Sequence, residues 1–261
     1  MINATDSKGT FYKLNQKEGI PIVFIHGVGL DHNIWDPQID EFDNTVLIYD
    51  ILGHGRTPLN KEKISFDDFS DQIINLIDEL KFDKIHLVGF SIGSLIARNF
   101  GTKFSDRLKS LTLLCSIFNR SDNEQKIVNE RFEQTKKDKK LTKDALNRWF
   151  TEEYRQNNPD VMNTIRNWVM ENKKDVYPKA YQVLVDGVDE LLDSTLPINC
   201  PTLILTGDED FGNSPQMSSE ISKQIKGSEL KILPGLRHMA LIEDANTVNK
   251  LLLEFLLRNV N

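Results

Sequence analysis

The chain alternates between short apolar runs and longer stretches with helical spacing. Six runs are apolar on both faces and too short for ordinary helices: residues 20–25, 45–49, 85–88, 111–117, 202–206 and 229–233. Short runs of this kind, separated by helices, are typical of a parallel sheet that is covered on both faces. Helical spacing is clearest over residues 69–80 and 248–256. The pattern therefore predicts an α/β fold with a mostly parallel central sheet flanked by helices.

The sheet pattern stops after Phe118, and charged helical segments replace it. Pro159 and Pro178 divide this region into at least three helices, because proline interrupts a helix at any position beyond its first turn. An all-helical stretch inside an alternating fold indicates an insertion. We therefore expect an α/β core formed by residues 1–118 and 195–261, and a helical cap formed by residues 119–194.

A strand-turn-helix motif with a central serine lies within the core pattern. Residues 89–93 are Gly-Phe-Ser-Ile-Gly, and they stand directly after an apolar run and directly before a helical stretch. So sharp a turn holds its central residue in a strained conformation above the sheet, and the residues two positions away on either side must be small. Gly89 and Gly93 meet that requirement. Ser91 is therefore the candidate nucleophile of a serine hydrolase.

A serine hydroxyl is a poor nucleophile near neutral pH, so it needs a basic group and a carboxylate that orients the base. His238 is the only one of the five histidines that follows the carboxylate-rich segment 207–210. An early glycine-containing segment, His-Gly-Val-Gly at 26–29, follows the first predicted strand. These features give the chain order nucleophile, acid, histidine.

With that order and those motifs, the chain resembles the α/β-hydrolase superfamily over essentially its whole length. More narrowly, it is similar to the enol-lactonase, carboxylesterase and cofactor-free perhydrolase branch. The segments that carry this resemblance are 26–35, 49–57, 87–93, 201–215 and 233–243. The resemblance also implies a helical cap inserted before the strand that delivers the acid.

The resemblance implies specific roles for several residues. It places the acid three residues after a glycine, which selects Asp210 over Asp208. The backbone N-H groups of Val28 and Ile92 would form the oxyanion hole, and His26 would shape the loop that carries Val28.

Candidate pocket walls are less well specified by the sequence. His26, Trp35, Phe90, Trp149 and Trp168 are candidates, although aromatic residues at helical spacing are often simple core residues. Of the other histidines, His86 is expected in the core, His54 in a structural turn, and His32 at the surface or near the entrance of the site.

Three competing motifs carry less weight. The carboxylates of segment 207–210 could bind a metal, but the segment does not continue as a calcium loop, and we expect no metal and no cofactor. Asp210, Phe211 and Gly212 spell the magnesium motif of kinases, without the other kinase motifs. Residues 27–29 resemble the start of a dinucleotide loop, but His32 stands where the third glycine would be.

Composition narrows the choice of partners. A net charge of -7 argues against nucleic-acid binding, and the basic run at 136–140 is expected to be a solvated helix end. No stretch approaches the roughly 18 apolar residues that cross a bilayer, and no secretory signal is visible. Cys115 and Cys200 are expected to be structural thiols. We expect a cytoplasmic protein that acts on a small molecule, and the sequence leaves its oligomeric state open.

These observations predict a cofactor-independent serine hydrolase that cleaves a carboxylic ester or lactone through an acyl-enzyme on Ser91. Serine at the turn argues against a dehalogenase, which needs aspartate there. Three alternatives stay open: a carbon-carbon bond hydrolase with the same triad, a perhydrolase with the same triad, and a slow-turnover small-molecule sensor on this fold.

Overall fold

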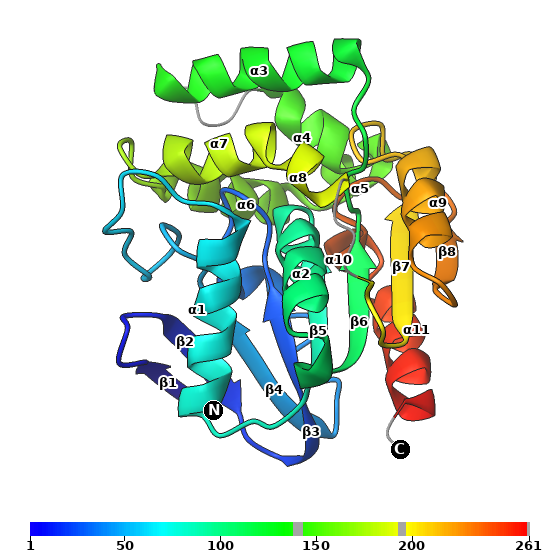
Figure 1. Ribbon diagram of the computed structural model, residues 1–261. Helices are drawn as coiled ribbons and strands as arrows, with labels where there is room; N and C mark the ends of the chain where they lie inside the picture. Colours follow the sequence, from blue (N-terminus) through cyan, green and yellow to red (C-terminus); the bar gives the residue numbers. More distant parts are fainter. Residues whose placement is uncertain (138–142, 193–196, 260–261) are drawn as a thin grey trace.

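The computed structural model describes residues 1–137, 143–192 and 197–259. Its sheet has eight strands in the order β1-β2-β4-β3-β5-β6-β7-β8 (Figure 1). Their bounds are β1 Ile2–Thr5, β2 Phe11–Asn15, β3 Glu18–Ile25, β4 Asn44–Tyr49, β5 Ile85–Phe90, β6 Leu108–Leu114, β7 Thr202–Gly207 and β8 Glu229–Leu233. Strand β2 is antiparallel to both neighbours, and every pair from β4 to β8 is parallel. The predicted α/β fold is confirmed, and β1 and β2 are additions to the predicted strands.

Helices cover both faces of the sheet. The helices on one face are α1 (Phe66–Glu79), α2 (Ile92–Lys103) and α9 (Pro215–Gln224). The 3-10 turn η1 (His32–Trp35), α10 (Ala240–Glu243) and α11 (Ala245–Arg258) cover the other face, and the short turn η2 (Ser105–Arg107) leads into β6. Along β3, Ile22 and Phe24 contact one layer, whereas Val23 and Ile25 contact the other. This alternation explains why the central strands are apolar on both faces.

The helical region between β6 and β7 lies beyond the carboxyl ends of the central strands (Figure 1). Its described helices are α3 (Asp122–Lys136), α4 (Lys143–Trp149), α5 (Glu152–Asn157), α6 (Pro159–Glu171), α7 (Tyr177–Asp186) and α8 (Val188–Leu192). We call residues 119–192 of this region the cap. The predicted domain boundary at 194/195 lies outside the described residues, as does most of the basic run at 136–140.

Both cysteines, Cys115 and Cys200, are buried free thiols. Burial raises the pKa of both, that of Cys200 to about 11. Among the described residues, no helix combines the length and the apolar character that a membrane span requires.

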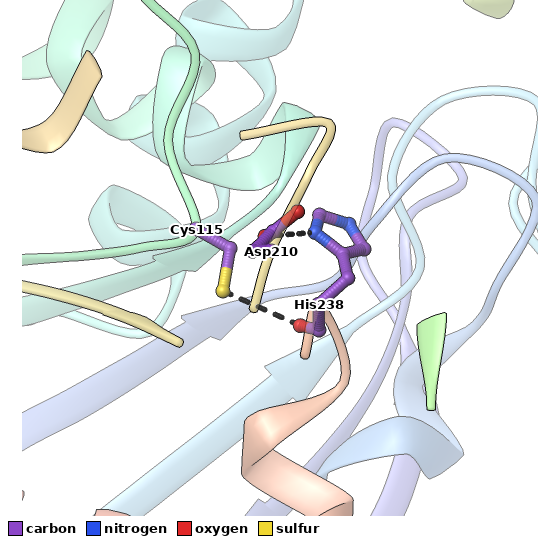
Figure 2. A group of neighbouring side chains, drawn as sticks. All are labelled: Cys115, Asp210 and His238. Atoms are coloured by element: carbon purple, nitrogen blue, oxygen red, sulfur yellow. Dashed lines mark hydrogen bonds and ion pairs between the residues drawn. The ribbon is translucent and has the colours of Figure 1, made fainter. Parts of the chain in front are cut away.

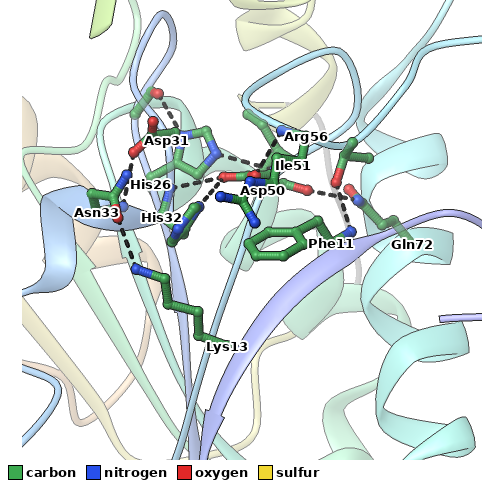
Figure 3. Close-up of polar contacts among 12 residues, drawn as sticks. Phe11, Lys13, His26, Asp31, His32, Asn33, Asp50, Ile51, Arg56 and Gln72 are labelled. Carbon is green, nitrogen blue, oxygen red and sulfur yellow. Dashed lines mark hydrogen bonds and ion pairs between the residues drawn. The ribbon is translucent and has the colours of Figure 1, made fainter. Parts of the chain in front are cut away.

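A buried polar network centred on Asp50, which directly follows β4, holds the loops at the carboxyl edge of the sheet (Figure 3). One oxygen of Asp50 accepts hydrogen bonds from the N-H and the Nδ1 of His32, at 2.9 and 2.7 Å, and its other oxygen accepts from the N-H of Arg56 at 2.8 Å. Burial alone would raise the pKa of Asp50, but the His32 hydrogen bond and the neighbouring histidines lower it. A Cβ at Gly55 would lie 2.3 Å from this carboxylate, so the turn at that position requires glycine.

Two neutral histidines continue the network. Nε2 of His26 accepts from the N-H of Ile51 at 3.0 Å, and Nε2 of His54 accepts from the N-H of Gly29 at 3.0 Å. Burial lowers the pKa of His26 to about 3, assisted by His54, and burial lowers the pKa of His54 to about 4. Both imidazoles therefore act at neutral pH as uncharged acceptors that hold backbone.

Another buried histidine, His86, lies within β5. Nδ1 of His86 is 2.7 Å from the hydroxyl of Ser110, whereas its Nε2 has no hydrogen-bond partner among the described residues. The core position expected for His86 is correct, but only one of its two ring nitrogens is satisfied. Burial lowers its pKa to about 4, assisted by the charge of Lys109.

We predict that the free energy of unfolding falls as the pH is lowered from 6.5 to 4.5. Unfolded histidines have a pKa near 6.5, so in this window the unfolded chain binds more protons than the folded one. His26, His54 and His86 then each contribute a slope of about 1.4 kcal/mol per pH unit. Urea unfolding at several pH values measures the slope, and His86→Gln should make it shallower by roughly one histidine's share. Equal slopes for the variant and the parent would contradict this assignment.

Candidate active site

Ser91 stands alone between β5 and α2 in a strained conformation, with φ 56° and ψ -120°. A Cβ at Gly89 would lie 2.2 Å from the carbonyl oxygen of Gly93, and a Cβ at Gly93 would lie 2.4 Å from the carbonyl oxygen of Ile25. Real Cβ atoms do not approach backbone so closely, so both positions require glycine. The turn therefore packs directly against β3, with Ser91 at the carboxyl edge of the sheet.

An aspartate and a histidine from different loops form a short contact near this edge. Nδ1 of His238 lies 2.7 Å from Oδ2 of Asp210 (Figure 2). The other carboxylate oxygen accepts the N-H groups of Gly212 at 3.1 Å and Asn213 at 3.0 Å. The Asp210 side chain is 2% exposed. With Nδ1-H directed at the carboxylate, Nε2 of His238 can accept a proton.

Asp208, the alternative acid, has a different partner. Its carboxylate accepts the N-H of Gly235 at 2.7 Å, so it links the segment after β7 to the loop that follows β8. The same two loops also touch at Gly207, where a Cβ would lie 2.1 Å from the carbonyl oxygen of Leu236. The geometry therefore favours Asp210 as the partner of His238, with Asp208 bracing the loop.

Cys115 holds the histidine loop from the end of β6. Its thiol donates to the carbonyl of His238 at 3.3 Å (Figure 2), and its own carbonyl accepts the side-chain amide of Asn213. Burial raises the pKa of this thiol well above its usual value, and the charge of Asp210 adds to the effect. Cys115 is therefore a neutral thiol with a structural contact, and it is not a second nucleophile.

In the part of the chain that the structure describes, two clusters bring together enough ligand atoms to be considered as metal sites. Cys115, Asp210 and His238 bring their ligand atoms within 4.8 Å of one another, as do Asp31, His32 and Asp50. Metals bind cysteine as thiolate, which the raised pKa of Cys115 opposes. In the second cluster both oxygens of Asp50 already accept hydrogen bonds from protein groups. Neither donor set fits a metal centre well.

A cavity of about 120 Å³ lies between the core and the cap. Ser91 and His238 both line it, although no hydrogen bond joins their side chains in the described structure. Such contacts often tighten only when substrate is bound. The ring of Phe90 packs against that of His238 at 4.9 Å. The cap supplies the opposite wall, through Arg120, Val128, Arg131, Gln134, Thr135, Ala145, Arg148, Trp149, Tyr177, Tyr181 and Leu184.

The predicted oxyanion groups lie beside this cavity. Val28 lines it, and Ile92 is the first residue of α2, where backbone N-H groups have no partner within the helix. The loop around Val28 is fixed from both sides, because the N-H of Gly29 binds His54 and the carbonyl of Gly29 accepts the side-chain amide of Asn172 at 2.8 Å. Asn172 belongs to the cap, so the cap helps to set the shape of this loop.

Only some of the residues predicted as pocket walls line the cavity at Ser91. Phe90 and Trp149 line the cavity. Trp35 is fully buried against Phe24, with ring centroids 4.7 Å apart, so its assignment as a pocket wall is wrong. Trp168 lines a different, polar cavity, and that assignment is also wrong.

Two of the histidines also lie away from the cavity at Ser91. His26 is fully buried, where it shapes the loop and does not contact the cavity. His32 is 4% exposed and lines the second cavity.

Sequence reasoning did not identify Arg237, which joins three parts of the site. Its guanidinium lies 3.3 Å from the carboxylate of Glu209 and donates to the carbonyls of Asn147 and Phe150 at the end of α4. The N-H of Met239 also donates to the carbonyl of Trp149 at 2.9 Å. The loop that carries His238 is therefore tied to the cap. Only the adjacency of Arg237 to His238 could have marked it in the sequence.

Comparison with known proteins supports the same fold. Residues 20–134 match the α/β-hydrolase fold family. The chain is 28% identical to an (E)-2-((N-methylformamido)methylene)succinate hydrolase of Acinetobacter baylyi, over 92% of each protein. It is 25% identical to 3-oxoadipate enol-lactonase 1 of the same organism, over 80% of this chain and 79% of that protein.

Solved structures have the same architecture. The enol-lactonase from Burkholderia xenovorans superimposes with a TM-score of 0.86 at 22% identity, over 98% of this chain and 100% of that one. A thermophilic esterase from Thermogutta terrifontis superimposes with a TM-score of 0.86 at 22% identity, over 100% of this chain and 99% of that one. Sheet order, strained serine turn and these similarities agree: the chain has the α/β-hydrolase fold, and its residues 20–134 match the family of that fold.

Proposed function

We propose that the protein is a serine hydrolase that cleaves a carboxylic ester or lactone of a small molecule through an acyl-enzyme on Ser91. The observation that carries this proposal is the 2.7 Å contact between Asp210 and His238 at a cavity that Ser91 also lines. A strained serine, an imidazole and a buried carboxylate are the three parts that acyl transfer needs.

The chemistry follows from the position of each group. Oγ of Ser91 attacks the substrate carbonyl while Nε2 of His238 takes its proton, and the carboxylate of Asp210 stabilises the imidazolium. The N-H groups of Val28 and Ile92 stabilise the negative oxygen of the tetrahedral intermediate. The imidazolium then protonates the leaving alcohol. Water, activated by His238, releases the acyl group and restores the free serine.

The names of related proteins support a hydrolase, and the lactonases among them favour an ester or lactone bond. Matches to this chain include an enol-lactonase and a succinate-derivative hydrolase, and the structural neighbours include an esterase. The cavity has room for a small substrate only, since it encloses about 120 Å³.

We predict that Ser91→Ala retains the fold and lowers hydrolysis of 4-nitrophenyl esters by at least roughly a thousandfold. The reason is that the Ser91 hydroxyl is the nucleophile that forms the acyl-enzyme. A fluorophosphonate probe followed by peptide mass spectrometry should label Ser91 in the parent protein. Near-normal turnover by the folded variant would overturn the proposed mechanism.

Asp210 and Asp208, both in the segment after β7, should differ sharply in their effect on kcat. Asp210→Asn should lower kcat by about 10⁴-fold, because an amide favours the wrong histidine tautomer. Asp208→Asn is the matched control and should cost far less, since the carboxylate of Asp208 accepts the N-H of Gly235 and has no hydrogen bond to His238 among the described residues. Steady-state kinetics of both variants on one ester gives the ranking. The reverse ranking would reassign the acid.

Substitutions of Trp149 and Trp168 should also differ in their effect on substrate preference, although both residues belong to the cap. Trp149 lines the cavity at Ser91, so Trp149→Ala should change kcat/KM unevenly across acyl groups, by roughly 1 to 3 kcal/mol where a contact is lost. Trp168 lines the second cavity, so Trp168→Ala should leave the order of substrates unchanged. A panel of esters with graded acyl chains measures both. Equal slowing of every ester by Trp149→Ala would identify that residue as structural support.

A further inference from the structure

The catalytic cavity has an unusual charge for this protein. Three arginines line it: Arg120 from the segment before α3, Arg131 from α3 and Arg148 from α4. All three are half-buried, and among the described residues no aspartate or glutamate lines the cavity. The whole chain carries a net charge of -7. The cluster of positive charges at this cavity therefore contrasts with the negative net charge of the chain.

The three arginines share one wall of this cavity with Tyr181. Burial raises the pKa of the Tyr181 hydroxyl, and the charges of Arg131, Arg120 and Arg148 act in the opposite direction. Tyr181 also lines the cavity and packs edge-on against Tyr177, with ring centroids 5.8 Å apart. The cationic wall is thus built on packed aromatic side chains and not on a loose surface.

Arg120 has a clear structural contact in addition. Its guanidinium donates to the carbonyl of Leu184 at 2.9 Å and to that of Val185 at 3.3 Å, near the end of α7. These contacts hold the group against the helix and fix where its charge lies. Arg131 and Arg148 reach the same cavity from α3 and α4.

We propose that the substrate carries a carboxylate remote from the scissile carbonyl, and that Arg131 and Arg148 bind this carboxylate while Arg120 contributes its charge. This inference rests on the proposed function, because it assigns a substrate class to the same cavity. Core residues would then perform the chemistry, and the cap would recognise the acid.

The physical basis is the shape and charge of guanidinium. Its planar N-H groups match the two oxygens of a carboxylate, and such charge-assisted hydrogen bonds are stronger than neutral ones. Because the three arginine side chains are half-buried, solvent and salt screen their attraction to a carboxylate less than at an open surface. Guanidinium also binds phosphate, so an alkyl phosphate is the competing anion in the test below.

A matched pair of esters tests the proposal. 4-Nitrophenyl hydrogen adipate and 4-nitrophenyl heptanoate have acyl chains of similar length, and only the first carries a charge. The parent protein should show a kcat/KM for the adipate ester at least tenfold higher than for the heptanoate ester. The ratio should decline as ionic strength rises, because salt weakens the attraction.

Substitutions of single arginines test which residues cause the preference for the charged ester. Arg131→Gln and Arg148→Gln should each lower kcat/KM for the adipate ester by about tenfold or more, mainly through KM, and so collapse the ratio between the two esters. Arg166→Gln is the matched control. It removes one positive charge from exposed α6, where Arg166 contacts Asn163, and it should leave the ratio as in the parent.

A binding measurement separates this inference from the proposed function. Isothermal titration calorimetry of the Ser91→Ala variant with adipate should show binding that Arg131→Gln weakens, whether or not esters are cleaved. Ser91-dependent hydrolysis of both esters with equal efficiency, and no adipate binding, would overturn the carboxylate assignment and leave the hydrolase intact. Adipate binding without Ser91-dependent hydrolysis would support the anion site and overturn the proposed function. Tighter binding of butyl phosphate than of adipate would overturn the choice of carboxylate.

Discussion

The site depends on direct contact between backbone segments at the carboxyl edge of the sheet. Because Gly93 has no side chain, the serine turn can lie directly against β3. Gly207 allows the segment that carries Asp210 to lie equally close to the loop after β8. A side chain at either position would overlap a carbonyl oxygen, so these glycines permit a spacing that no other residue allows. Parallel strands end at the same edge, and this close spacing brings residues from distant parts of the chain into one cavity.

Core and cap are mechanically connected through the loop that carries His238. Arg237 contacts Glu209 on the core side and carbonyls of α4 on the cap side, and Cys115 holds the carbonyl of His238 from β6. Asn172 makes a similar connection from the cap to the loop around Gly29. A displacement of the cap would therefore reach both His238 and the loop around Gly29. Under the proposed function, substrate contacts in the cap would influence the position of His238 in this way.

Charge is distributed differently in the two parts of the molecule. In the core, burial keeps His26, His54 and His86 neutral, and they serve as hydrogen-bonding groups that fix loops and strands. In the cap, three arginines line the wall of a cavity. Low-dielectric walls concentrate the field of such groups, so a few cations can set the local potential of an acidic protein. This separation fits a division between fixed catalytic geometry and recognition of the substrate.

The sequence by itself determined the features that local rules control. Alternation of apolar runs and helical spacing predicted the parallel strands and the helical interruption, and glycines two positions from Ser91 predicted the sharp turn. It missed β1 and β2, because a short edge hairpin buries too little to leave a clear apolar pattern.

Only the tertiary structure decided which side chains meet. Asp208 and Asp210 are both acidic and two residues apart, and the turn after β7 directs one toward Gly235 and the other toward His238. Trp35 and Trp149 are equally aromatic, but one lies under the sheet and the other faces the cavity. The three cap arginines come from three segments, and their convergence depends on how those helices rotate and pack. Spacing along a chain fixes the face of one helix, whereas contacts between helices are set by the packing of the whole molecule.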